Sequence, residues 1–318
     1  MSSANPFDPA LFRPEAIAPE TLAFAENLRK ATASRPPLGT PPPADAEAAP
    51  SPFPRPPKSP RARVIEVDAP GGRKVQLRIL APDNPRGAYL AIHGGGLVMG
   101  SADQDDAMLA RIADNTGLAA VSVEYRLAPQ HPYPAAWDDC EAAALWLANN
   151  VKAEFGGDAL AIGGESAGAT LAVPTLVRMR DKHGFTGFSA ANLSYGNYDT
   201  TGTPSQTWIG RHGYMLRTSD IAQCSDLYAP APANRRDPDM SALYADVHGM
   251  PAALFSVGTL DPFLDDSMFL YARWIAAGNT AELAIYPGAT HGFNMFPLAI
   301  AKTANARIDA FLKAQTGG

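Results

Sequence analysis

Two hydrophobic patterns alternate along most of the chain after residue 60. Short runs rich in small and β-branched apolar residues predict six buried strands, at residues 88–93, 119–125, 159–164, 188–194, 252–258 and 282–287. Helical patterns lie between most of these runs, for example at residues 137–151 and 267–278. Continuous apolar strands that alternate with helices are typical of a mainly parallel sheet covered by helices on both faces.

Two further strands are predicted before this region. Residues 63–70 and 73–80 alternate between apolar and polar side chains, and Gly71 and Gly72 join them, so the pattern predicts an antiparallel hairpin. The hairpin makes the predicted sheet mixed. The sequence therefore predicts an α/β fold in which a mostly parallel, eight-stranded mixed sheet is flanked by helices.

Two segments interrupt the alternation. Residues 19–33 have helical spacing, and residues 35–61 are so rich in proline that they predict an extended strap or linker. Residues 195–239 are rich in Gly, Pro, Thr and aromatic residues, and they predict an insertion above the carboxyl-terminal edge of the sheet. The predicted organisation is an N-terminal helix and strap (1–50), a core (51–194 and 240–318) and the insertion (195–239).

The charge pattern narrows the class of partner. The 318-residue chain has a formal net charge of −6, and its Lys and Arg residues are scattered, which leaves no basic footprint for nucleic acid or an anionic membrane. A small neutral substrate fits this pattern better. No apolar run approaches the roughly 20 residues that span a bilayer, and the first residues do not match a signal peptide, so we expect a cytoplasmic protein.

The two cysteines, Cys140 and Cys224, are too few for a disulfide framework or a cysteine-based metal site, and we expect both to be reduced. The His, Cys and carboxylate residues do not cluster along the chain. We therefore expect neither a metal ion nor an organic cofactor, and any chemistry must come from ordinary side chains and the backbone.

The strongest candidate for chemistry follows one of the predicted strands. Gly164 and Gly168 flank Ser166 in the pattern G-x-S-x-G, and a helical pattern begins directly after the serine. Glycine at both positions permits a sharp turn from strand to helix, because a side chain there would collide with neighbouring backbone. The turn presents the Ser166 hydroxyl at a helix N-terminus, whose N–H groups favour developing negative charge.

A serine hydroxyl is a weak nucleophile, so it needs a base, and the base needs an orienting acid. Asp261 and His291 each follow the end of a later predicted strand, so both reach the same edge of the sheet as Ser166. Asp265 and Asp266 compete for the acid role, but they lie where a helical pattern starts and suit a helix N-terminus. The order and the shared edge predict a triad of Ser166, Asp261 and His291.

Three glycines follow another predicted strand, in the run His93-Gly94-Gly95-Gly96. Backbone without side chains can approach a ligand oxygen closely, and hydrolysis of an acyl group needs N–H donors beside a developing oxyanion. The amides of Gly94, Gly95 and Ala167 are the predicted donors. His93 is predicted to hold the loop by hydrogen bonding. The spacing matches neither of the common glycine-rich phosphate-binding patterns.

The motifs occur in an order that resembles the hormone-sensitive-lipase family of bacterial esterases, within the α/β-hydrolase fold. The matching stretches are HGGG, YRLAPQHPYPAAWDD, GESAG, DPFLDD and HGF, and the resemblance covers residues 60–318. It implies the same triad, with the serine as nucleophile, the aspartate as acid and the histidine as base, and the same oxyanion donors. It also implies a cap built from the N-terminal helical region and the insertion.

Two residues depart from the family pattern. Glu165 stands where the family usually has Asp, and we hypothesise that it positions groups behind the nucleophile. Leu97 stands where an aromatic residue often follows the glycines, which reduces bulk on the acyl side. The insertion offers further candidates for an apolar substrate pocket, although ordinary packing explains each of them as well: Tyr195, Tyr198, Trp208, Tyr214 and Met215.

The leading hypothesis is a serine carboxylesterase that hydrolyses short- to medium-chain acyl esters through an acyl-enzyme intermediate. An amidase would use the same triad but must protonate a nitrogen leaving group, and the sequence leaves this alternative open. A ligand-binding protein of this fold typically lacks a member of the triad, whereas all three residues are present here. The expected partner is a small-molecule ester. A homodimer through the edge strand that ends near Pro287 is a further candidate assembly.

Overall fold

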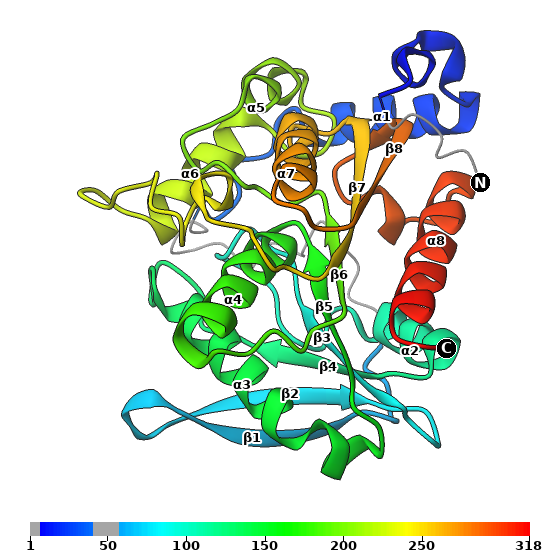
Figure 1. The fold of residues 1–318 in the computed structure, drawn as a ribbon. Helices are drawn as coiled ribbons and strands as arrows, with labels where there is room; N and C mark the ends of the chain where they lie inside the picture. Colours follow the sequence, from blue (N-terminus) through cyan, green and yellow to red (C-terminus); the bar gives the residue numbers. More distant parts are fainter. Residues whose placement is uncertain (1–6, 41–56) are drawn as a thin grey trace.

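A computed structural model describes residues 7–40 and 57–318, which fold into a central sheet covered by helices (Figure 1). Within these residues the sheet has eight strands in the order β1-β2-β4-β3-β5-β6-β7-β8. The strands are β1 (Arg63–Ala69), β2 (Arg73–Leu80), β3 (Gly87–Ile92), β4 (Ala119–Glu124), β5 (Ala159–Glu165), β6 (Ala190–Ser194), β7 (Ala252–Leu260) and β8 (Ala281–Thr290). The described part of the chain thus confirms the predicted eight-stranded α/β fold.

The sheet is mixed, as predicted. β1 pairs with β2, and β2 with β4, in antiparallel orientation, while the pairs from β4 through β3 to β8 are parallel. Gly71 and Gly72 turn the chain between β1 and β2 with φ of 78° and 71°, a left-handed conformation that glycine adopts without strain. On β2, Val75, Leu77 and Ile79 are buried against the core, which explains the alternating pattern of this strand.

Helices cover both faces of the sheet. α2 and α8 pack together over one face, and α3, α4 and α7 lie over the other (Figure 1). Their bounds are α2 (Asp106–Thr116), α3 (Ala135–Phe155), α4 (Ala167–His183), α7 (Leu264–Ala276) and α8 (Ala299–Gln315). The helix predicted at residues 137–151 is the middle of α3, which starts after Pro134 and stops at Gly156 with a left-handed φ. The helix predicted at residues 267–278 corresponds to α7.

Parallel strands bring the candidate functional residues to one edge of the sheet. β3 ends just before His93, and β5 ends just before Ser166. β7 ends just before Asp261, and β8 ends just before His291. Because β3, β5, β7 and β8 run in the same direction, their carboxyl ends share one edge, where ligands bind in folds of this type.

Helices outside the sheet layers come from the N-terminal segment and from the connection between β6 and β7. They are α1 (Pro19–Thr32), α5 (Pro204–Trp208) and α6 (Thr218–Tyr228). In Figure 1 α1 and α5 lie in the upper part of the view. α1 agrees closely with the helix predicted at residues 19–33. Residues 1–6 and 41–56, which include most of the predicted proline-rich strap, lie outside the described residues.

A single carboxylate joins the N-terminal segment to α6. Asp220 accepts hydrogen bonds from the Arg35 side chain, from the backbone N–H of Leu38, and from the backbone and side chain of Arg217. The Arg217 guanidinium also donates to the carbonyl oxygen atoms of Arg35 and Thr32. These contacts place residues 32–38 directly against the segment between β6 and β7, which links two parts of the chain far apart in sequence.

Two further features bear on the sequence analysis. The helices within residues 7–40 and 57–318 include none that is long and apolar enough to cross a membrane. Cys140 and Cys224 are both buried free thiols, as the sequence predicts. Burial raises the pKa of the Cys224 thiol to about 12, so this side chain is neutral and unreactive near neutral pH.

Candidate active site

Ser166 occupies the sharp turn that its flanking glycines predict. Its backbone has φ of 56° and ψ of −119°, a conformation that costs free energy for a residue with a side chain and occurs at functional turns. A methyl group added to Gly164 or Gly168 would overlap the carbonyl oxygen of Ile92, so these positions accept only glycine without a backbone shift. The turn is held by a hydrogen bond of 3.0 Å from Ser166 N to the carbonyl oxygen of Ser194.

The structure brings Ser166, His291 and Asp261 into one hydrogen-bonded row. The Ser166 Oγ lies 2.8 Å from His291 Nε2, and His291 Nδ1 lies 3.0 Å from Asp261 Oδ2 and 3.2 Å from Oδ1. Asp261 is completely buried, and it also accepts a hydrogen bond of 2.9 Å from the backbone N–H of Phe263. This geometry allows the imidazole to take the serine proton at Nε2 while the buried carboxylate holds the hydrogen on Nδ1.

Two aromatic rings hold the imidazole in place. Phe263 meets the His291 ring edge to face at 5.3 Å between centroids, and Tyr195 does so at 4.9 Å. Asp265 and Asp266, the competing acids, have other partners. The Asp265 carboxylate accepts from the backbone N–H of Ser205, and Asp266 accepts from backbone N–H groups near the start of the segment between β6 and β7.

The glycine loop lies beside the serine. A Cβ built on Gly94 would lie 3.6 Å from the Ser166 Cβ, which shows how close this backbone comes to the hydroxyl-bearing residue. Gly95 has φ of 122°, a conformation that favours glycine. Within residues 7–40 and 57–318, no protein acceptor takes a hydrogen bond from the N–H groups of Gly94, Gly95 or Ala167. Unpaired donors beside a serine suit an oxygen atom that gains negative charge.

His93 is buried beneath this loop. Its Nδ1 donates a hydrogen bond of 2.8 Å to the carbonyl oxygen of Gly94, and its ring stacks on Tyr125 with 4.0 Å between centroids. The Tyr125 hydroxyl donates to the His93 carbonyl oxygen at 2.9 Å. Burial lowers the pKa of His93 to about 4, so the ring is neutral near neutral pH and acts as a hydrogen-bonding support.

Glu165 is buried directly before Ser166 and binds a residue that the sequence analysis did not select. Its carboxylate accepts a hydrogen bond from Asn294 Nδ2, and the Asn294 Oδ1 accepts one from the Tyr195 hydroxyl. Burial raises the pKa of Glu165, although these polar partners oppose the shift. Asn294 lies three residues after His291, so its place behind the HGF motif was the available signal, but asparagine alone predicts no role.

The predicted pocket residues lie in different environments. Tyr195 packs on His291, whereas Tyr198 is fully buried against Phe255 and Trp208 is 63% exposed beside His212. In the part of the chain that the structure describes, neither Tyr198 nor Trp208 makes a ring contact with the triad. Leu97, in the glycine loop, is buried. In the segment between β6 and β7, Met215 is buried and Tyr214 is half-buried.

The fold and this serine arrangement define an α/β hydrolase, and comparison with known proteins agrees. A family model described as the alpha/beta hydrolase fold matches residues 89–295. The chain is 35% identical over 238 residues to the ethyl acetate hydrolase of Pseudomonas putida, and the match covers 70% of this chain and 72% of that protein. It is 33% identical over 244 residues to the carboxylic ester hydrolase LipN of Mycobacterium tuberculosis, and this match covers 74% of this chain and 65% of LipN.

Solved structures lead to the same family. LAE6, an alpha/beta hydrolase from the metagenome of Lake Arreo in Spain, has a TM-score of 0.83 at 29% identity, covering 96% of this chain and 100% of that one. An esterase of the bacterial hormone-sensitive lipase family has a TM-score of 0.76 at 28% identity, covering 95% and 100%. The chain belongs to the α/β-hydrolase fold family, and within it to the esterases related to hormone-sensitive lipase. These relatives support carboxylic ester hydrolysis as its activity.

Proposed function

We propose that this protein is a serine carboxylesterase that hydrolyses short- to medium-chain acyl esters through an acyl-enzyme intermediate. The observation that carries the proposal is the unbroken row of hydrogen bonds from Ser166 through His291 to Asp261. A hydroxyl group alone is a weak nucleophile, and an imidazole within hydrogen-bonding distance makes it an effective one. The family relationship and the names of the relatives support an ester as the substrate.

The proposed reaction proceeds in two halves. Ser166 Oγ attacks the ester carbonyl carbon while His291 Nε2 takes the hydroxyl proton, and the carbonyl oxygen becomes an oxyanion. His291 then returns the proton to the leaving alcohol, which leaves the acyl group on the serine. A water molecule, deprotonated by the same imidazole, attacks the acyl carbon and releases the carboxylic acid.

Backbone groups stabilise the oxyanion in this scheme. The N–H groups of Gly94, Gly95 and Ala167 are the proposed donors. Gly94 lies beside Ser166, Ala167 follows it in the chain, and none of the three N–H groups has a protein acceptor among the described residues. Ala167 adds the positive end of α4. Loss of one oxyanion donor typically raises the barrier by about 2.7–4 kcal/mol. Gly95 requires glycine for a steric reason, because a Cβ at this position would lie 2.0 Å from the carbonyl oxygen of Met99.

The proposed acyl size follows from what surrounds the imidazole. Leu216, Ile221 and Phe263 form a small buried apolar cluster with Leu38 packed against it, and Phe263 touches His291. Apolar side chains beside the imidazole suit a short aliphatic acyl group. The relatives named ethyl acetate hydrolase and acetyl esterase also support a short acyl chain.

The cap is part of the same proposal. Residues 1–50 and 195–239 would form it above the core of residues 51–194 and 240–318, and the contacts of Asp220 with the N-terminal segment support a joined unit. A cytoplasmic location and a homodimer through β8 stay predictions. Cell fractionation tests the first, and light scattering after size-exclusion chromatography tests the second, with a monomer as the contrary result.

The test compares the wild type with Ser166→Ala on p-nitrophenyl acetate, butyrate and octanoate at neutral to mildly alkaline pH. We expect turnover by the wild type that decreases toward octanoate, and no turnover by Ser166→Ala. An alkyl fluorophosphonate should add covalently to the wild type and not to the variant, as read by intact mass. Ser219→Ala, which changes an exposed serine, is the matched control.

Three outcomes would contradict the proposal. Turnover of the esters by Ser166→Ala at the wild-type rate would exclude this serine as the nucleophile. Turnover of the matching p-nitroanilides by a wild type that leaves the esters intact would assign the protein to the amidases. A folded wild type that neither hydrolyses the esters nor reacts with the fluorophosphonate would exclude the acyl-enzyme mechanism.

A further inference from the structure

Asn294 connects three segments that carry the proposed active site. It lies on the short helix η6 (Phe293–Met295), three residues after His291, and its side chain is buried. Its Oδ1 accepts the hydrogen of the Tyr195 hydroxyl, and its Nδ2 donates to the Glu165 carboxylate. One amide therefore joins the end of β5, the residue that follows β6, and the loop that follows β8.

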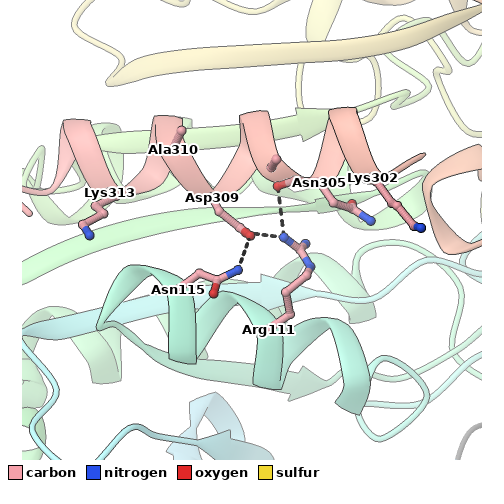
Figure 2. A pocket seen from close by; sticks show the side chains of 8 residues that line it. Arg111, Asn115, Lys302, Asn305, Asp309, Ala310 and Lys313 are labelled. Atoms are coloured by element: carbon pink, nitrogen blue, oxygen red, sulfur yellow. Dashed lines mark hydrogen bonds and ion pairs between the residues drawn. The ribbon is translucent and has the colours of Figure 1, made fainter. Parts of the chain in front are cut away.

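The helices behind the site hold this asparagine in turn. Asn305 of α8 donates from its Nδ2 to the carbonyl oxygen of Asn294 at 3.0 Å. Figure 2 shows that the carbonyl oxygen of Asn305 accepts a hydrogen bond from Arg111 of α2, at 3.0 Å. Arg111 also pairs with Asp309, to which Asn115 donates at 2.7 Å. The backbone of Asn294 is thus attached to the packed pair of α2 and α8.

The two residues that Asn294 joins, Glu165 and Tyr195, are direct neighbours of the proposed nucleophile and base. Glu165 directly precedes Ser166 in the chain, and the Tyr195 ring packs edge to face on His291. We propose that Asn294 is a positioning residue that holds the His291 loop and the Ser166 turn at their hydrogen-bonding separation. The inference rests on the proposed esterase function, and it adds a residue that acts through Glu165 and Tyr195.

Asparagine suits this place for a chemical reason. The Glu165 carboxylate requires a donor, and the Tyr195 hydroxyl requires an acceptor, and a single side-chain amide offers both. An aspartate of the same shape would set a second carboxylate against Glu165, because it has no hydrogen to donate when ionised. An aliphatic residue would offer neither a donor to the buried Glu165 carboxylate nor an acceptor to the Tyr195 hydroxyl.

The first variant is therefore Asn294→Asp, which keeps the shape and removes the donor. We expect kcat/KM for p-nitrophenyl butyrate to fall by about tenfold to a hundredfold, the range for loss of a hydrogen bond to a charged group. The loss should lie in kcat, with little change in KM, because the asparagine acts through other residues and does not bind the ester. Adding Glu165→Gln to Asn294→Asp returns a donor to the pair, so we expect the double variant to recover most of the lost kcat.

The pH profile provides a readout that a purely structural role would leave unchanged. In Asn294→Asp the two carboxylates share a proton, so the pair opens as the pH rises and the shared proton leaves. The ratio of variant to wild-type kcat should therefore fall with rising pH, and it should be flat for the double variant. The other charged or titratable groups around Glu165 among the described residues are Arg111, His291, Tyr195, Tyr89 and Asp105, and all of them remain in both variants.

Controls separate this inference from the proposed function. Asn150→Asp on α3, where the amide donates to the carbonyl oxygen of Trp146 at 2.8 Å, is the matched control and should keep wild-type kcat. If Asn294→Asp does not fold, Tyr195→Phe replaces it, because this change removes the hydroxyl donor and keeps the ring on His291. An active wild type with kcat unchanged in Asn294→Asp, or in Tyr195→Phe, would overturn the inference. A wild type without ester turnover would overturn the proposed function instead.

Discussion

The contacts of Asp220 allow a quantitative prediction about how the N-terminal segment is held. The Asp220 side chain has no exposed surface, while its partners Arg35 and Arg217 each retain 17%. The carboxylate accepts from both guanidinium groups and from the backbone N–H groups of Leu38 and Arg217, at 2.8 to 3.1 Å. Asp220→Asn keeps the shape, but it removes the charge and turns one acceptor into a donor that faces other donors.

The size of the effect follows from the burial of these groups. Breaking a buried ion pair by removing one partner costs about 3–5 kcal/mol. Partial exposure of Arg35 and Arg217 lets water stabilise them in the variant, so we expect the low end, about 3 kcal/mol. For a chain of 318 residues this loss lowers the Tm by about 4 °C.

The pH dependence of this contribution has a definite sign. Burial alone would raise the pKa of Asp220, but the hydrogen bonds from Arg217 and Leu38 and the charge of Arg35 together hold it below its ordinary value. A carboxyl group with a lower pKa in the folded state stabilises the fold above its unfolded pKa of about 3.9. That stabilisation is lost as the pH falls through the folded pKa. The difference in Tm between wild type and Asp220→Asn should therefore shrink in acid.

The assay is thermal unfolding followed by circular dichroism, with hydrogen exchange of the Leu38 amide as a local probe. Asp226→Asn on the same helix is the matched control, since that side chain is 67% exposed and pairs with Arg235. We expect it to change stability by less than about 0.5 kcal/mol. Equal Tm values for the two variants at neutral pH, with unchanged exchange at Leu38, would refute the reasoning.

Two further predictions concern the proposed active site. Asp261→Asn should lower kcat by about 10⁴-fold, because the amide favours the wrong imidazole tautomer, and a loss below tenfold in p-nitrophenyl butyrate hydrolysis would contradict this. Gly168→Ala should lower both Tm and kcat, since the added methyl group overlaps the carbonyl oxygen of Ile92 and shifts the Ser166 turn. Wild-type Tm and kcat in this variant would show that the turn accommodates the methyl group, which would contradict this prediction.

The strands and the triad candidates were predictable because their signals are local. Strand runs are short and apolar, and the pattern around Ser166 combines a strand, a turn and a helix within a few residues. Helix ends were less predictable. The predicted helix at residues 137–151 misses the last turn of α3, where the charged residues before Gly156 weaken the apolar periodicity while the helix continues.

Contacts between distant segments had no such signal. Asn294 gains its partners only when β5, β6 and β8 meet, and no spacing in the sequence encodes that meeting. The aromatic residues between β6 and β7 show the same difficulty. Composition marks Tyr198 and Trp208 equally as pocket candidates, yet one is fully buried beside Phe255 and the other is largely exposed.

The row of hydrogen bonds also makes the activity a reporter of folding. Ser166 and His291 are 125 residues apart in sequence, and the glycine loop follows a third strand, so no short fragment contains the complete arrangement. During refolding, β8 must dock on β7 before the imidazole can reach the serine. Recovery of ester hydrolysis would thus mark a late event, whereas circular dichroism would register helices such as α3 and α4 earlier. The delay between the circular dichroism signal and the recovery of activity measures the lifetime of partly folded chains that cannot yet hydrolyse an ester.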